Sequence, residues 1–561
     1  LILNMIHYFW PSLLELGFIV SMVTPIIKAS KGSQSKSFYT DSAFRTWYGT
    51  GQTGWKVKYY KGLGTSTSAE AREYFKKIQD LTVKFDTDIM SDKSIILAFD
   101  KKKADARKSW LLENTSKDAD QLEVPYGSVK KLDISDFVHK DLVNFSLADL
   151  KRSIAHMADG LKPSQRKVMF ACFKKNLKDE MKVAQLAAFV AEKSAYHHGE
   201  VSLADTIVKL ANDYTGSNNI NLLEPCGQFG TRLMGGKDAS QTRYIFTKLT
   251  KDARKIFDPR DDAVLNYLDD DGRSIEPDFY MPTLPMVLVN GTEGIGTGFS
   301  CYVPPFNPDD IKENIKRYLR GEEFVSMRPW FRGFKGVVHK EEDTWMMEGV
   351  WNWSGTNIVV TELPPGRWTQ DYKEYLDGLV EKKLIGGYTN NSTTEDVHFE
   401  ITEYAGKDLL KDLKLRKTFR VSNMHLFHPT KGIHKYASPE EILQDFIELR
   451  LEHYKKRKAH LIDVLEKRAD MCDHKSKFVS MVIEGKLVVF KRKKVELETE
   501  MSSIFPNIDG NLDYLLNTRT VEYTEERVKA LLAEATQTKE DLEKMLKTSH
   551  ITMWKNDIKN M

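Results

Sequence analysis

The alternation of apolar and polar residues predicts a strand, a turn and a helix in the N-terminal part of the chain. Apolar residues alternate with polar ones over 55–59, which is typical of a strand, and Gly62 and Gly64 follow as a turn. A helix is expected behind the Thr/Ser cluster at 65–68, because good helix formers come next. This order can present backbone N–H groups to an anion.

The pattern changes from helical to strand-rich in the middle of the chain. Residues 147–193 have a largely helical pattern. From 276 to about 431, short alternating runs such as "GTNIVVTEL" and "DVHFEITEY" lie between prolines, and these runs predict strands.

Two long amphipathic helices are predicted at the C-terminal end. In "SPEEILQDF", Ser438 is the expected N-cap, with Pro439 at N1 and Glu441 at N3. Two apolar seams follow, at Ile447, Leu451, Tyr454, Leu461, Leu465 and Cys472, and at Val528, Leu531, Ala535, Leu542 and Met545. We expect an antiparallel pair with a compact knob between its helices.

Length and composition are typical of a multidomain globular protein. The 561 residues are too many for one hydrophobic core and suggest about three or four domains. The apolar N-terminal stretch is interrupted by His7, Pro11 and Glu15, so it predicts neither a membrane span nor a signal peptide. The 4 cysteines are widely spaced and indicate a reducing, intracellular setting.

Positive charge is concentrated in one part of the chain. The net charge is only +3, but residues 151–250 hold 15 Lys and Arg against 9 Asp and Glu. Lys162, Arg166, Lys167, Lys174 and Lys175 lie on or just before a predicted helix, where a solvated face is the ordinary interpretation. A local basic surface nevertheless favours a polyanionic partner.

Several candidate motifs do not support a nucleotide or metal site. The glycines of "NGTEGIGTGFS" do not fit G-x-G-x-x-G and there is no Walker lysine, which leaves Ile295 as either a buried anchor or a wedge between base steps. His197 and His198 lack the spacing of metal ligands and suit a phosphate better. The pair Asp86 and Asp88 is interpreted as an ordinary surface feature.

The stretch "GGKDASQTRYIFTKL" contains Arg243 beside Tyr244. Most tyrosines are packing residues. A phenol next to a guanidinium is also a candidate nucleophile, because the cation stabilises the phenolate. The residues alone leave both interpretations open.

Five motifs in order carry a family resemblance: "YYKGLGTSTSAEAREYF", "SLADLKRSIAHMADGLKPSQRKV", "AYHHGEVSLADTIV", "GSNNINLLEPCGQFGTRLMGGKDASQTRYIFTKL" and "PMVLVNGTEGIGTGFS". The chain resembles the DNA-cleavage core of type IIA DNA topoisomerases over nearly its whole length. The first two motifs stand in one continuous polypeptide. In this respect the chain resembles the eukaryotic and large-DNA-virus form of the family.

The resemblance implies a multidomain α/β and α+β architecture. It would comprise the end of a Toprim domain at 1–116, a linker at 117–145, a winged-helix DNA-gate domain at 146–275, a mixed α/β tower at 276–431, and a coiled-coil arm with a C-gate at 432–561. The chain resembles a fragment that starts just after the Toprim metal ligands.

The resemblance also implies roles for individual residues. Tyr244 would attack a DNA phosphodiester to give a 5′-phosphotyrosyl link, Arg243 would assist it, and His198 would donate to phosphate or shuttle a proton. The implied DNA contacts are Arg107, Lys108, Arg152, Lys162, Tyr196, Ser202 and the intercalating Ile295.

The implied cofactors are Mg²⁺, with ligands upstream of this chain, and ATP, bound elsewhere in the full-length enzyme. The implied partners are double-stranded DNA and a second copy of the chain, with no membrane. The expected location is intracellular: the nucleus, or the host cytoplasm or virion if the chain is viral.

Two other functions remain as alternatives. The first is a non-catalytic module that binds, bends and dimerises on DNA, because the metal-ligand and ATPase segments are absent from this sequence. The second is a basic winged-helix regulator, which does not account for the long C-terminal helices.

Overall fold

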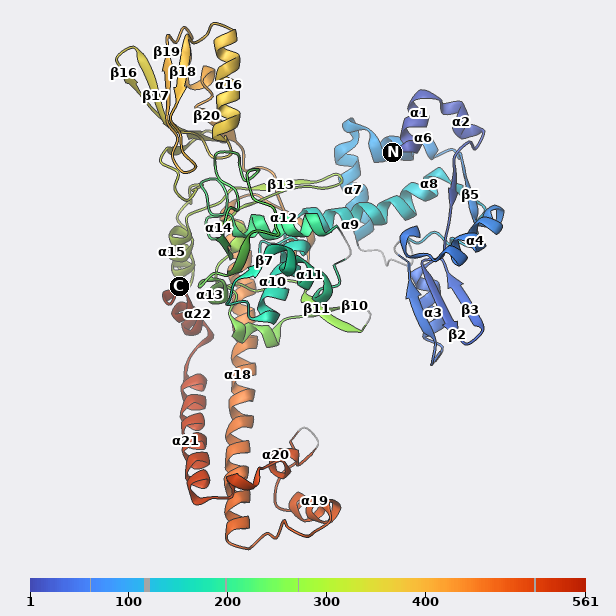
Figure 1. Cartoon of the computed structure of the whole chain (residues 1–561), viewed down its shortest axis with the longest axis vertical. Helices are drawn as coiled ribbons and strands as arrows, with labels where there is room; N and C mark the ends of the chain where they lie inside the picture. The colour runs from blue at the N-terminus through green and yellow to red at the C-terminus, as the bar shows by residue number, and fades with distance from the viewer. Residues whose placement is uncertain (61, 116–121, 197–198, 271, 509–510) are drawn as a thin grey trace. The chain divides into compact units, whose positions relative to one another are not determined.

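The computed structural model describes residues 1–60, 62–115, 122–196, 199–270, 272–508 and 511–561 (Figure 1). The chain forms two compact units, each made of several stretches of sequence. Unit 1 comprises Leu1–Ala155, Glu293–Tyr302 and Asn423–Lys435, and unit 2 comprises His156–Thr292, Val303–Ser422 and Tyr436–Met561.

Unit 1 is a mixture of helices and small sheets. Its strands form a sheet in the order β1-β5-β6, a second in the order β3-β2-β4, and the pairs β12-β13 and β21-β22. The strands are β1 (Val20–Met22), β2 (Ile27–Lys31), β3 (Gln34–Phe38), β4 (Lys56–Tyr59), β5 (Thr82–Asp86), β6 (Lys131–Asp133), β12 (Thr292–Ile295), β13 (Ser300–Val303), β21 (Met424–His428) and β22 (Gly432–Tyr436). The helices of eight or more residues are α1 (Ile2–Phe9), α3 (Asp41–Tyr48), α4 (Ser68–Lys76), α6 (Ser91–Phe99), α7 (Ala104–Thr115) and α9 (Val143–Ser153).

Helix α4 begins where the Thr/Ser cluster predicts it. The Thr67 hydroxyl accepts a hydrogen bond from the Glu70 N–H, and the Glu70 carboxylate accepts one from the Thr67 N–H at 2.8 Å, which completes a capping box. The Glu70 carboxylate also accepts from the Tyr60 hydroxyl, and these bonds lower the pKa of Glu70 to about 2. The predicted strand, turn and helix N-terminus are confirmed.

The predicted linker at 117–145 is wrong over its second half. Strand β6 pairs in parallel with β5, and a continuous helix follows through α8 (Ile134–Asp136), the π-helix η4 (Phe137–Leu142) and α9. Val124, Leu132 and Ile134 are buried in the main core of unit 1. Val124 lies eight residues before Leu132, and Leu132 lies two residues before Ile134, with charged residues around them. The segment therefore lacks the sustained alternation of apolar and polar residues that predicts a strand.

The predicted tower at 276–431 is divided between the two units. The hairpin of β12 and β13 belongs largely to unit 1, where Asp149 of α9 accepts hydrogen bonds from the N–H and the hydroxyl of Thr297, both at 3.0 Å. Gly294 approaches the backbone of α9 so closely that an added Cβ would lie 2.1 Å from the Ser153 carbonyl oxygen. Gly294, and Gly296 beside Leu150, therefore allow close packing on α9.

Within unit 2, the central segment (residues 156–292) combines helices with a small antiparallel sheet. The sheet has the order β7-β9-β8. The main elements are α10 (Pro163–Lys175), β7 (Met181–Lys182), α11 (Val183–Lys193), α12 (Glu200–Ala211), β8 (Leu223–Cys226), β9 (Phe246–Leu249), the 3-10 helix η5 (Pro259–Val264), β10 (Tyr267–Asp270) and β11 (Arg273–Pro277). The helical pattern predicted to Lys193 is confirmed in part: α9, α10 and α11 are helices, but residues 154–162 and residues 176–182, which include β7, are not helical.

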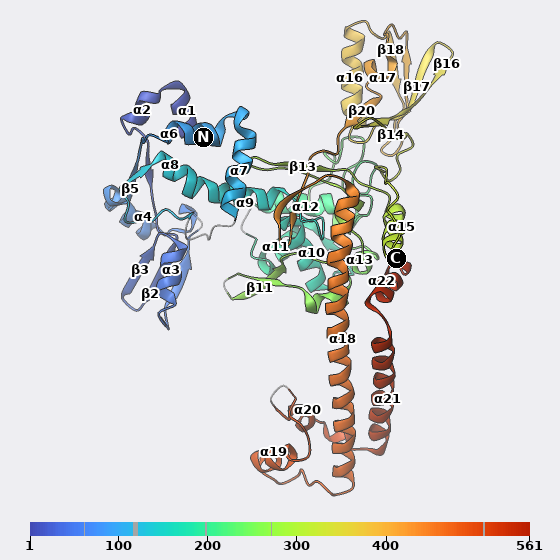
Figure 2. The same ribbon diagram turned by 180° about the vertical axis from the view of Figure 1, so that it is seen from behind.

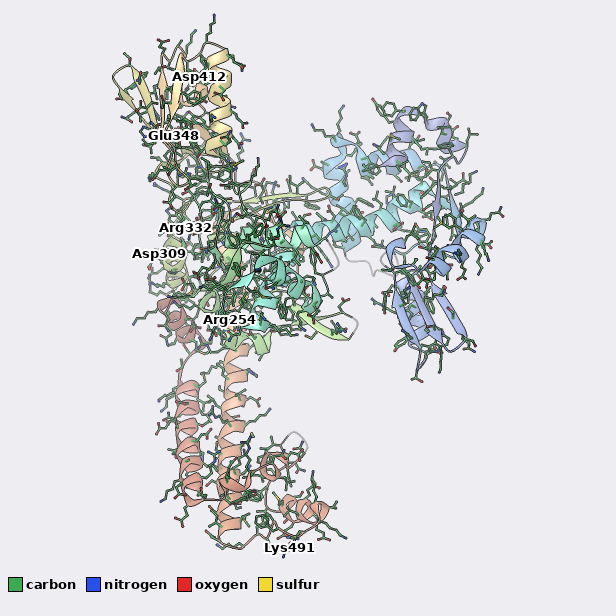
Figure 3. The ribbon with its side chains drawn as sticks, in the orientation of Figure 1. Arg254, Asp309, Arg332, Glu348, Asp412 and Lys491 are labelled. Carbon is green, nitrogen blue, oxygen red and sulfur yellow. The ribbon has the colours of Figure 1, made fainter. Side chains whose placement is uncertain are left out.

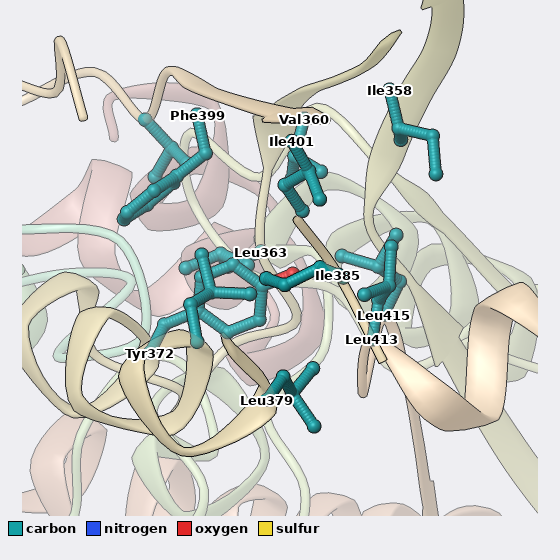
Figure 4. Close-up of a cluster of buried hydrophobic side chains, with 12 residues drawn as sticks. Ile358, Val360, Leu363, Tyr372, Leu379, Ile385, Phe399, Ile401, Leu413 and Leu415 are labelled. Atoms are coloured by element: carbon teal, nitrogen blue, oxygen red, sulfur yellow. The ribbon is translucent and has the colours of Figure 1, made fainter. Parts of the chain in front are cut away.

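The sheet segment (residues 303–422) contains two antiparallel sheets, β14-β15-β20 and β16-β17-β19-β18. Its core packs α16 against the second sheet and is dominated by Tyr372, Phe399 and branched aliphatic residues (Figure 4). The elements are α15 (Pro308–Tyr318), β14 (Val337–Glu341), β15 (Thr344–Glu348), β16 (Val350–Ser354), β17 (Asn357–Glu362), α16 (Thr369–Glu381), β18 (Gly387–Asn390), β19 (Phe399–Thr402), α17 (Leu409–Asp412) and β20 (Arg416–Phe419). The strands predicted for "GTNIVVTEL" and "DVHFEITEY" are confirmed.

Polar contacts attach the sheet segment to the central segment. The N–H of Arg332, labelled in Figure 3, donates to the Asn219 side chain at 2.8 Å, and the Arg332 guanidinium donates to the Asn221 side chain at 3.3 Å. The Asn219 amide donates in turn to the Val289 carbonyl at 2.9 Å. These bonds satisfy polar groups of which several are buried.

The arm segment (residues 436–561) consists of two long helices with a knob between them (Figures 1 and 2). Lys458 donates to the Leu546 carbonyl at 3.0 Å, and Arg468 pairs with Glu534 at 2.8 Å. The partner in the second helix moves backwards as the first helix advances, so the helices run antiparallel, as predicted. The knob (residues 484–524) has its own core, which includes Leu497, Met501 and Phe505. The helices are α18 (Pro439–Ile483), α19 (Lys494–Ser502), α20 (Asp513–Leu516), α21 (Glu525–Lys547) and α22 (His550–Lys559).

The N-terminus of α18 is capped nearly as the sequence predicts. The Ser438 hydroxyl accepts from the Glu441 N–H at 3.1 Å. The Glu441 carboxylate reaches back to the N–H of Ala437 at 2.6 Å, one residue before the N-cap. The start of the helix is confirmed, with the reciprocal bond displaced by one residue.

A buried ionic cluster, which we call the arm-base cluster (Asp258, Asp261, Arg450, Arg457 and Asp557), joins α18 to η5 and α22. Arg450 and Arg457 are both 0% exposed and both donate to the Asp261 carboxylate. Arg457 also donates to Asp557 of α22 at 2.7 Å. Although burial opposes ionisation, the two guanidinium groups hold the pKa of Asp261 below its usual range.

No helix in the described ranges has an apolar run long enough to cross a bilayer.

Candidate nucleic-acid interface and tyrosine site

Tyr244 lies immediately before β9 of the central segment. Its N–H donates to the Gln241 carbonyl at 2.9 Å, which forms a turn ahead of the strand. Ile245 is 2% exposed and Thr247 is 0% exposed, whereas Tyr244 is 65% exposed. The side chain therefore points away from the core, and the interpretation of Tyr244 as an ordinary packing residue is wrong.

Arg243 lies against the face of the Tyr244 ring. Its guanidinium carbon is 4.9 Å from the ring centroid, which is a cation–π geometry. Neither the Tyr244 hydroxyl nor the Arg243 guanidinium has a hydrogen bond or ion pair to another side chain in the part of the chain that the structure describes. Both groups are thus open to a ligand, and a phenolate or a phosphate oxygen would be stabilised by the neighbouring cation.

The loop between β8 and β9 (residues 227–243, the tyrosine loop) is held by internal bonds. The Asp238 carboxylate accepts from the N–H of Thr231 at 2.9 Å and from its hydroxyl at 2.6 Å. Gly230 has a φ of 96°, and a Cβ there would lie 2.5 Å from the Cα of Gly236. Only glycine permits this close approach of the two backbones.

The tyrosine loop and α12 line an open groove of about 770 Å³. Basic side chains at Lys209, Lys237 and Arg243 line it, together with Asp205. Ser202, a predicted DNA contact, is exposed in the first turn of α12, next to the lining residue Val201. The groove gives the predicted polyanion partner a positively charged surface beside Tyr244.

The basic residues predicted around α10 have three different environments. Lys162 caps α10, and its N–H donates to the Gln165 side chain at 2.9 Å. Lys174 and Lys175 are exposed, as a solvated face requires. Arg166 and Lys167 are not on this face, because Arg166 pairs with the buried Asp159 at 2.7 Å and Lys167 pairs with Glu276 at 2.8 Å.

Tyr196 lies between α11 and α12. Tyr196 is half-buried, and its N–H donates to the Ala191 carbonyl at 3.2 Å. His198, predicted to be a phosphate donor or proton shuttle, and His197 lie outside the described residues.

The other predicted contacts belong to unit 1. Lys108 pairs with Asp105 at 3.0 Å, and Arg152 lies 4.0 Å from Asp149. Arg107 caps the C-terminal end of α6: its Nε donates to the Ala98 carbonyl at 3.0 Å and its Nη2 to the Asp100 carbonyl at 2.7 Å. Much of the hydrogen-bonding capacity of Arg107 is thus used inside the protein.

Ile295 is at the end of β12, and its side chain is 78% exposed. The turn that follows is closed by the Gly296 N–H, which donates to the Phe299 carbonyl at 2.9 Å. The alternative that Ile295 is a buried anchor is therefore wrong. The anchor of this hairpin is Phe299, which is 5% exposed.

The described residues contain no group of three or more His, Cys, Asp or Glu side chains that could hold a metal ion. In the D-x-D pair, Asp86 pairs with Lys131 at 3.1 Å and Asp88 accepts hydrogen bonds from Ser91 and Ser135. Both carboxylates therefore have ordinary structural partners.

A family model for DNA gyrase/topoisomerase IV matches residues 152–559 of the chain. This match includes the end of α9, the central segment with Tyr244, the sheet segment and the arm. The chain belongs to the type IIA DNA topoisomerase family. A second family model, described as the C-terminal associated domain of TOPRIM, matches residues 22–150.

Relatives of this topoisomerase family come from distant eukaryotes. DNA topoisomerase 2 of Plasmodium falciparum (isolate K1 / Thailand) is 41% identical, and the alignment covers 100% of this chain and 43% of that protein. DNA topoisomerase 2 of Arabidopsis thaliana is 44% identical, with coverage of 89% and 35% respectively. The chain thus spans less than half the length of these relatives.

A solved topoisomerase structure has the same fold. The crystal structure of the Plasmodium falciparum topoisomerase II DNA-binding, cleavage and re-ligation domain superposes with a TM-score of 0.84. It is 42% identical in sequence, and the superposition covers 100% of this chain and 81% of that chain. The mixed α/β architecture is therefore that of a type II topoisomerase cleavage domain.

Sequence reasoning missed two residues that hold candidate site residues in place, one in each unit. Asp149 binds Thr297 of the Ile295 hairpin, and Asp238 closes the tyrosine loop. Both are single acidic residues without a motif around them. Their partners are 148 and 7 residues away, and only the nearer spacing could have suggested a turn.

Proposed function

We propose that the chain is the DNA-cleavage and religation core of a type II topoisomerase that breaks both strands of a duplex, passes a second duplex and reseals the break. The observation that carries the proposal is the exposed Tyr244 phenol with the Arg243 guanidinium over its ring. Family membership and the similarity to a DNA-binding, cleavage and re-ligation domain support it.

The proposed reaction is a transesterification. The Tyr244 oxygen forms a bond to phosphorus while the bond from phosphorus to the 3′ oxygen breaks, which gives a 5′-phosphotyrosyl link and a free 3′-hydroxyl. The phenol proton passes to solvent and the 3′ oxygen takes up a proton, so atoms and charge balance. Because one ester replaces another, religation needs no external energy source.

Arg243 stabilises the charge that develops in this reaction. The guanidinium over the ring stabilises the negative charge that develops on the phenolic oxygen in the transition state. Its free N–H groups can also donate to a non-bridging phosphate oxygen. Both effects lower the barrier in the forward and the reverse direction.

The remaining predicted residues complete the proposed DNA interface. Lys162, Tyr196 and Ser202 would contact the duplex in unit 2, and Lys108, Arg152 and the wedge Ile295 would do so in unit 1. Arg107 is proposed to act through the N–H groups that do not cap α6. His198 remains a prediction, since it lies outside the described residues.

Mg²⁺ and ATP are part of the proposal for the full-length enzyme. The described residues do not fit a metal site, so no step above passes through a metal ion. The family resemblance assigns the Mg²⁺ ligands and the ATPase to segments outside this chain.

In terms of architecture, we propose that the central segment is the winged-helix domain, the sheet segment the tower, and the arm segment the coiled coil with its C-gate.

Trapping of the covalent complex tests the proposal. The full-length protein is incubated with Mg²⁺ and a duplex labelled at either the 5′ or the 3′ end, and then denatured. Protein linked only to 5′ phosphate ends is the expected result. A protein that binds and bends the duplex but gives no adduct would instead be the non-catalytic DNA-bending module.

A homodimer is the proposed assembly, because each chain offers one Tyr244 and a double-strand break needs two nucleophiles. The knob of the arm exposes Val488, Phe490, Val495 and Val521, which provides an apolar surface for its twin. Deletion of residues 488–523 should weaken dimerisation in sedimentation velocity experiments and leave DNA affinity unchanged. Dimers of unchanged affinity would reject the C-gate assignment.

The proposed location is intracellular, where the chromosomes are.

A further inference from the structure

The tyrosine loop is bound to the sheet segment by a buried ion pair. Arg232 in the loop is 6% exposed and Glu362 at the end of β17 is 1% exposed. The Nη2 of Arg232 donates to Glu362, and its Nη1 donates to the Glu395 carbonyl at 3.4 Å. The two residues are 130 positions apart in sequence, so the pair joins two separate parts of unit 2.

Glu362 is fixed in place by its own segment. Its carboxylate accepts from the N–H of Leu363 at 2.9 Å and from the N–H of Lys335 at 3.3 Å. The charge therefore sits on a rigid acceptor at the end of a sheet strand. Arg232 must come to this acceptor, which fixes the position of the loop rather than that of the sheet.

The tyrosine loop also caps a helix of the sheet segment. Helix α16 has no side-chain N-cap, because the cap residue is Trp368. Its first N–H groups donate to the loop instead: Gln370 donates to the Leu233 carbonyl at 2.9 Å and Thr369 to the Arg232 carbonyl at 3.4 Å. The N–H groups at the start of α16, which have no partner within the helix, are thus hydrogen-bonded to the tyrosine loop.

Close packing of side chains also holds the tyrosine loop against the sheet segment. Gly235 packs against the Trp368 indole, and a Cβ there would lie 2.3 Å from the ring. Trp368 also meets the Tyr214 ring edge to face, with centroids 5.7 Å apart. The tyrosine loop is therefore held at one defined distance from the sheet segment at Gly235, which lies eight residues before Arg243.

A buried ion pair of this kind adds little net stability, because desolvation offsets most of the attraction between the charges. It does select one geometry, because a displaced partner leaves a buried charge unpaired. In this position the selected geometry is that of the loop that carries Arg243 and leads into Tyr244. Catalysis by a nucleophile is sensitive to a displacement of about 1 Å.

We infer that Arg232 and Glu362 are positioning residues for the cleavage reaction: they lock the tyrosine loop onto the sheet segment and so set the attack geometry of Tyr244. The inference rests on the proposed function. Neither residue touches the reacting atoms. Their effect is on the alignment of Tyr244, and therefore on the rate of cleavage at saturating DNA.

Single-turnover cleavage of a nicked duplex by the full-length protein tests the inference. Arg232→Met removes the charge and keeps the apolar stem, and Glu362→Gln keeps the shape of its side chain. We expect the Arg232→Met variant to cleave bound DNA about 10- to 100-fold more slowly, while its dissociation constant for DNA changes less than about threefold. The reversed pair Arg232→Glu with Glu362→Arg should recover part of the lost rate.

A second ion pair of the sheet segment, more exposed than Arg232–Glu362, provides the control. Arg416 pairs with Glu348 at 2.7 Å across β20 and β15, with side chains 38% and 23% exposed. Among the described residues, no hydrogen bond or ion pair joins either side chain to the tyrosine loop. Glu348 is labelled in Figure 3. Arg416→Met should leave the cleavage rate and the DNA affinity unchanged.

The outcomes separate this inference from the proposed function. A parent protein that forms no 5′ adduct rejects the proposed function. A parent that forms adducts, with a folded Arg232→Met variant that cleaves at the parental rate, rejects the positioning role alone. If Arg232→Met does not fold, Glu362→Gln decides: a parental rate in that variant, with the fold confirmed by circular dichroism, also rejects the role.

Discussion

Two sites in unit 2 place arginine against a tyrosine ring, one of them exposed and the other buried. At the start of β9, Arg243 lies 4.9 Å from the centre of the exposed Tyr244 ring. At the arm base, Arg450 and Arg457 lie 4.1 Å and 4.5 Å from the centre of the Tyr454 ring, which is 0% exposed. The two sites show what burial does to a phenol beside a cation.

Burial makes Tyr454 a structural residue. Its hydroxyl donates to Asp557 at 2.8 Å, and desolvation raises the pKa of its phenol above the usual value. The guanidinium groups beside it are neutralised by carboxylates. At Tyr244 neither the hydroxyl nor the cation has a side-chain partner among the described residues, so both can act on a substrate. A cation–π contact is therefore no sign of function unless solvent reaches it.

The largest expected difference is between the two tyrosines. Tyr244→Phe should abolish covalent complexes and preserve DNA affinity, because only the phenolic oxygen is lost. Tyr454→Phe should leave adduct formation intact, because its hydroxyl acts only within the arm base. Gel assays for 5′-linked protein measure both variants. Residual adduct in Tyr244→Phe would place the nucleophile at another residue.

The second difference concerns stability. Arg457→Met leaves the carboxylates of Asp261 and Asp557 without their buried partner, and the loss of one member of such a pair costs about 3–5 kcal/mol. Arg243→Met should have an effect below about 0.5 kcal/mol, because Arg243 is exposed. Urea unfolding, with hydrogen exchange at α22, compares the two. Equal midpoints would show that the arm-base cluster does not stabilise the arm.

The third prediction concerns rates at the exposed site. Arg243→Ala should slow cleavage and religation together by about 10²- to 10³-fold if its guanidinium acts as one transition-state donor. Arg450→Ala, the matched change at the buried site, should alter neither rate per folded molecule. Single-turnover assays in both directions measure this. An unchanged religation rate in Arg243→Ala would limit Arg243 to positioning of the DNA.

The smallest expected effect is that of an exposed apolar residue. Ile295→Ala should reduce the bending of bound DNA, and change non-specific affinity little, because the phosphate contacts supply that affinity. Its stability should stay close to that of the parent, since Ile295 is 78% exposed. Fluorescence energy transfer across the duplex reports the bend. Equal bending in both proteins would remove the role of Ile295 as a wedge.

Local elements could be predicted from the sequence because their signals are local. The capping residues Thr67 and Ser438, the alternation in β17 and the seams of α18 and α21 each act within a few residues of their own position. These parts of the fold needed no knowledge of distant partners. The exposure of Tyr244 is not among these features, because a tyrosine at the start of a strand fits a packed position as well as an exposed one.

The remaining features depend on contacts between distant residues. Arg450 and Arg457 occupy positions that a heptad pattern treats as polar, yet they are buried because Asp261, which lies 189 residues before Arg450, pairs with both. Arg166 and Lys167 look like a solvated face until Asp159 and Glu276 are placed beside them. A charged side chain does not reveal from sequence whether its counter-ion will exclude water from it.

The length of α18 has a mechanical consequence. The helix is continuous from the arm-base cluster at Arg450 to Phe478 in the core of the knob. At 1.5 Å per residue this distance is about 42 Å, so a tilt of about 1° at the arginines moves the knob by about 0.7 Å. A small rotation of α18 at the arm-base cluster, which lies in the same unit as Tyr244, therefore produces a larger displacement of the knob at the other end of the arm.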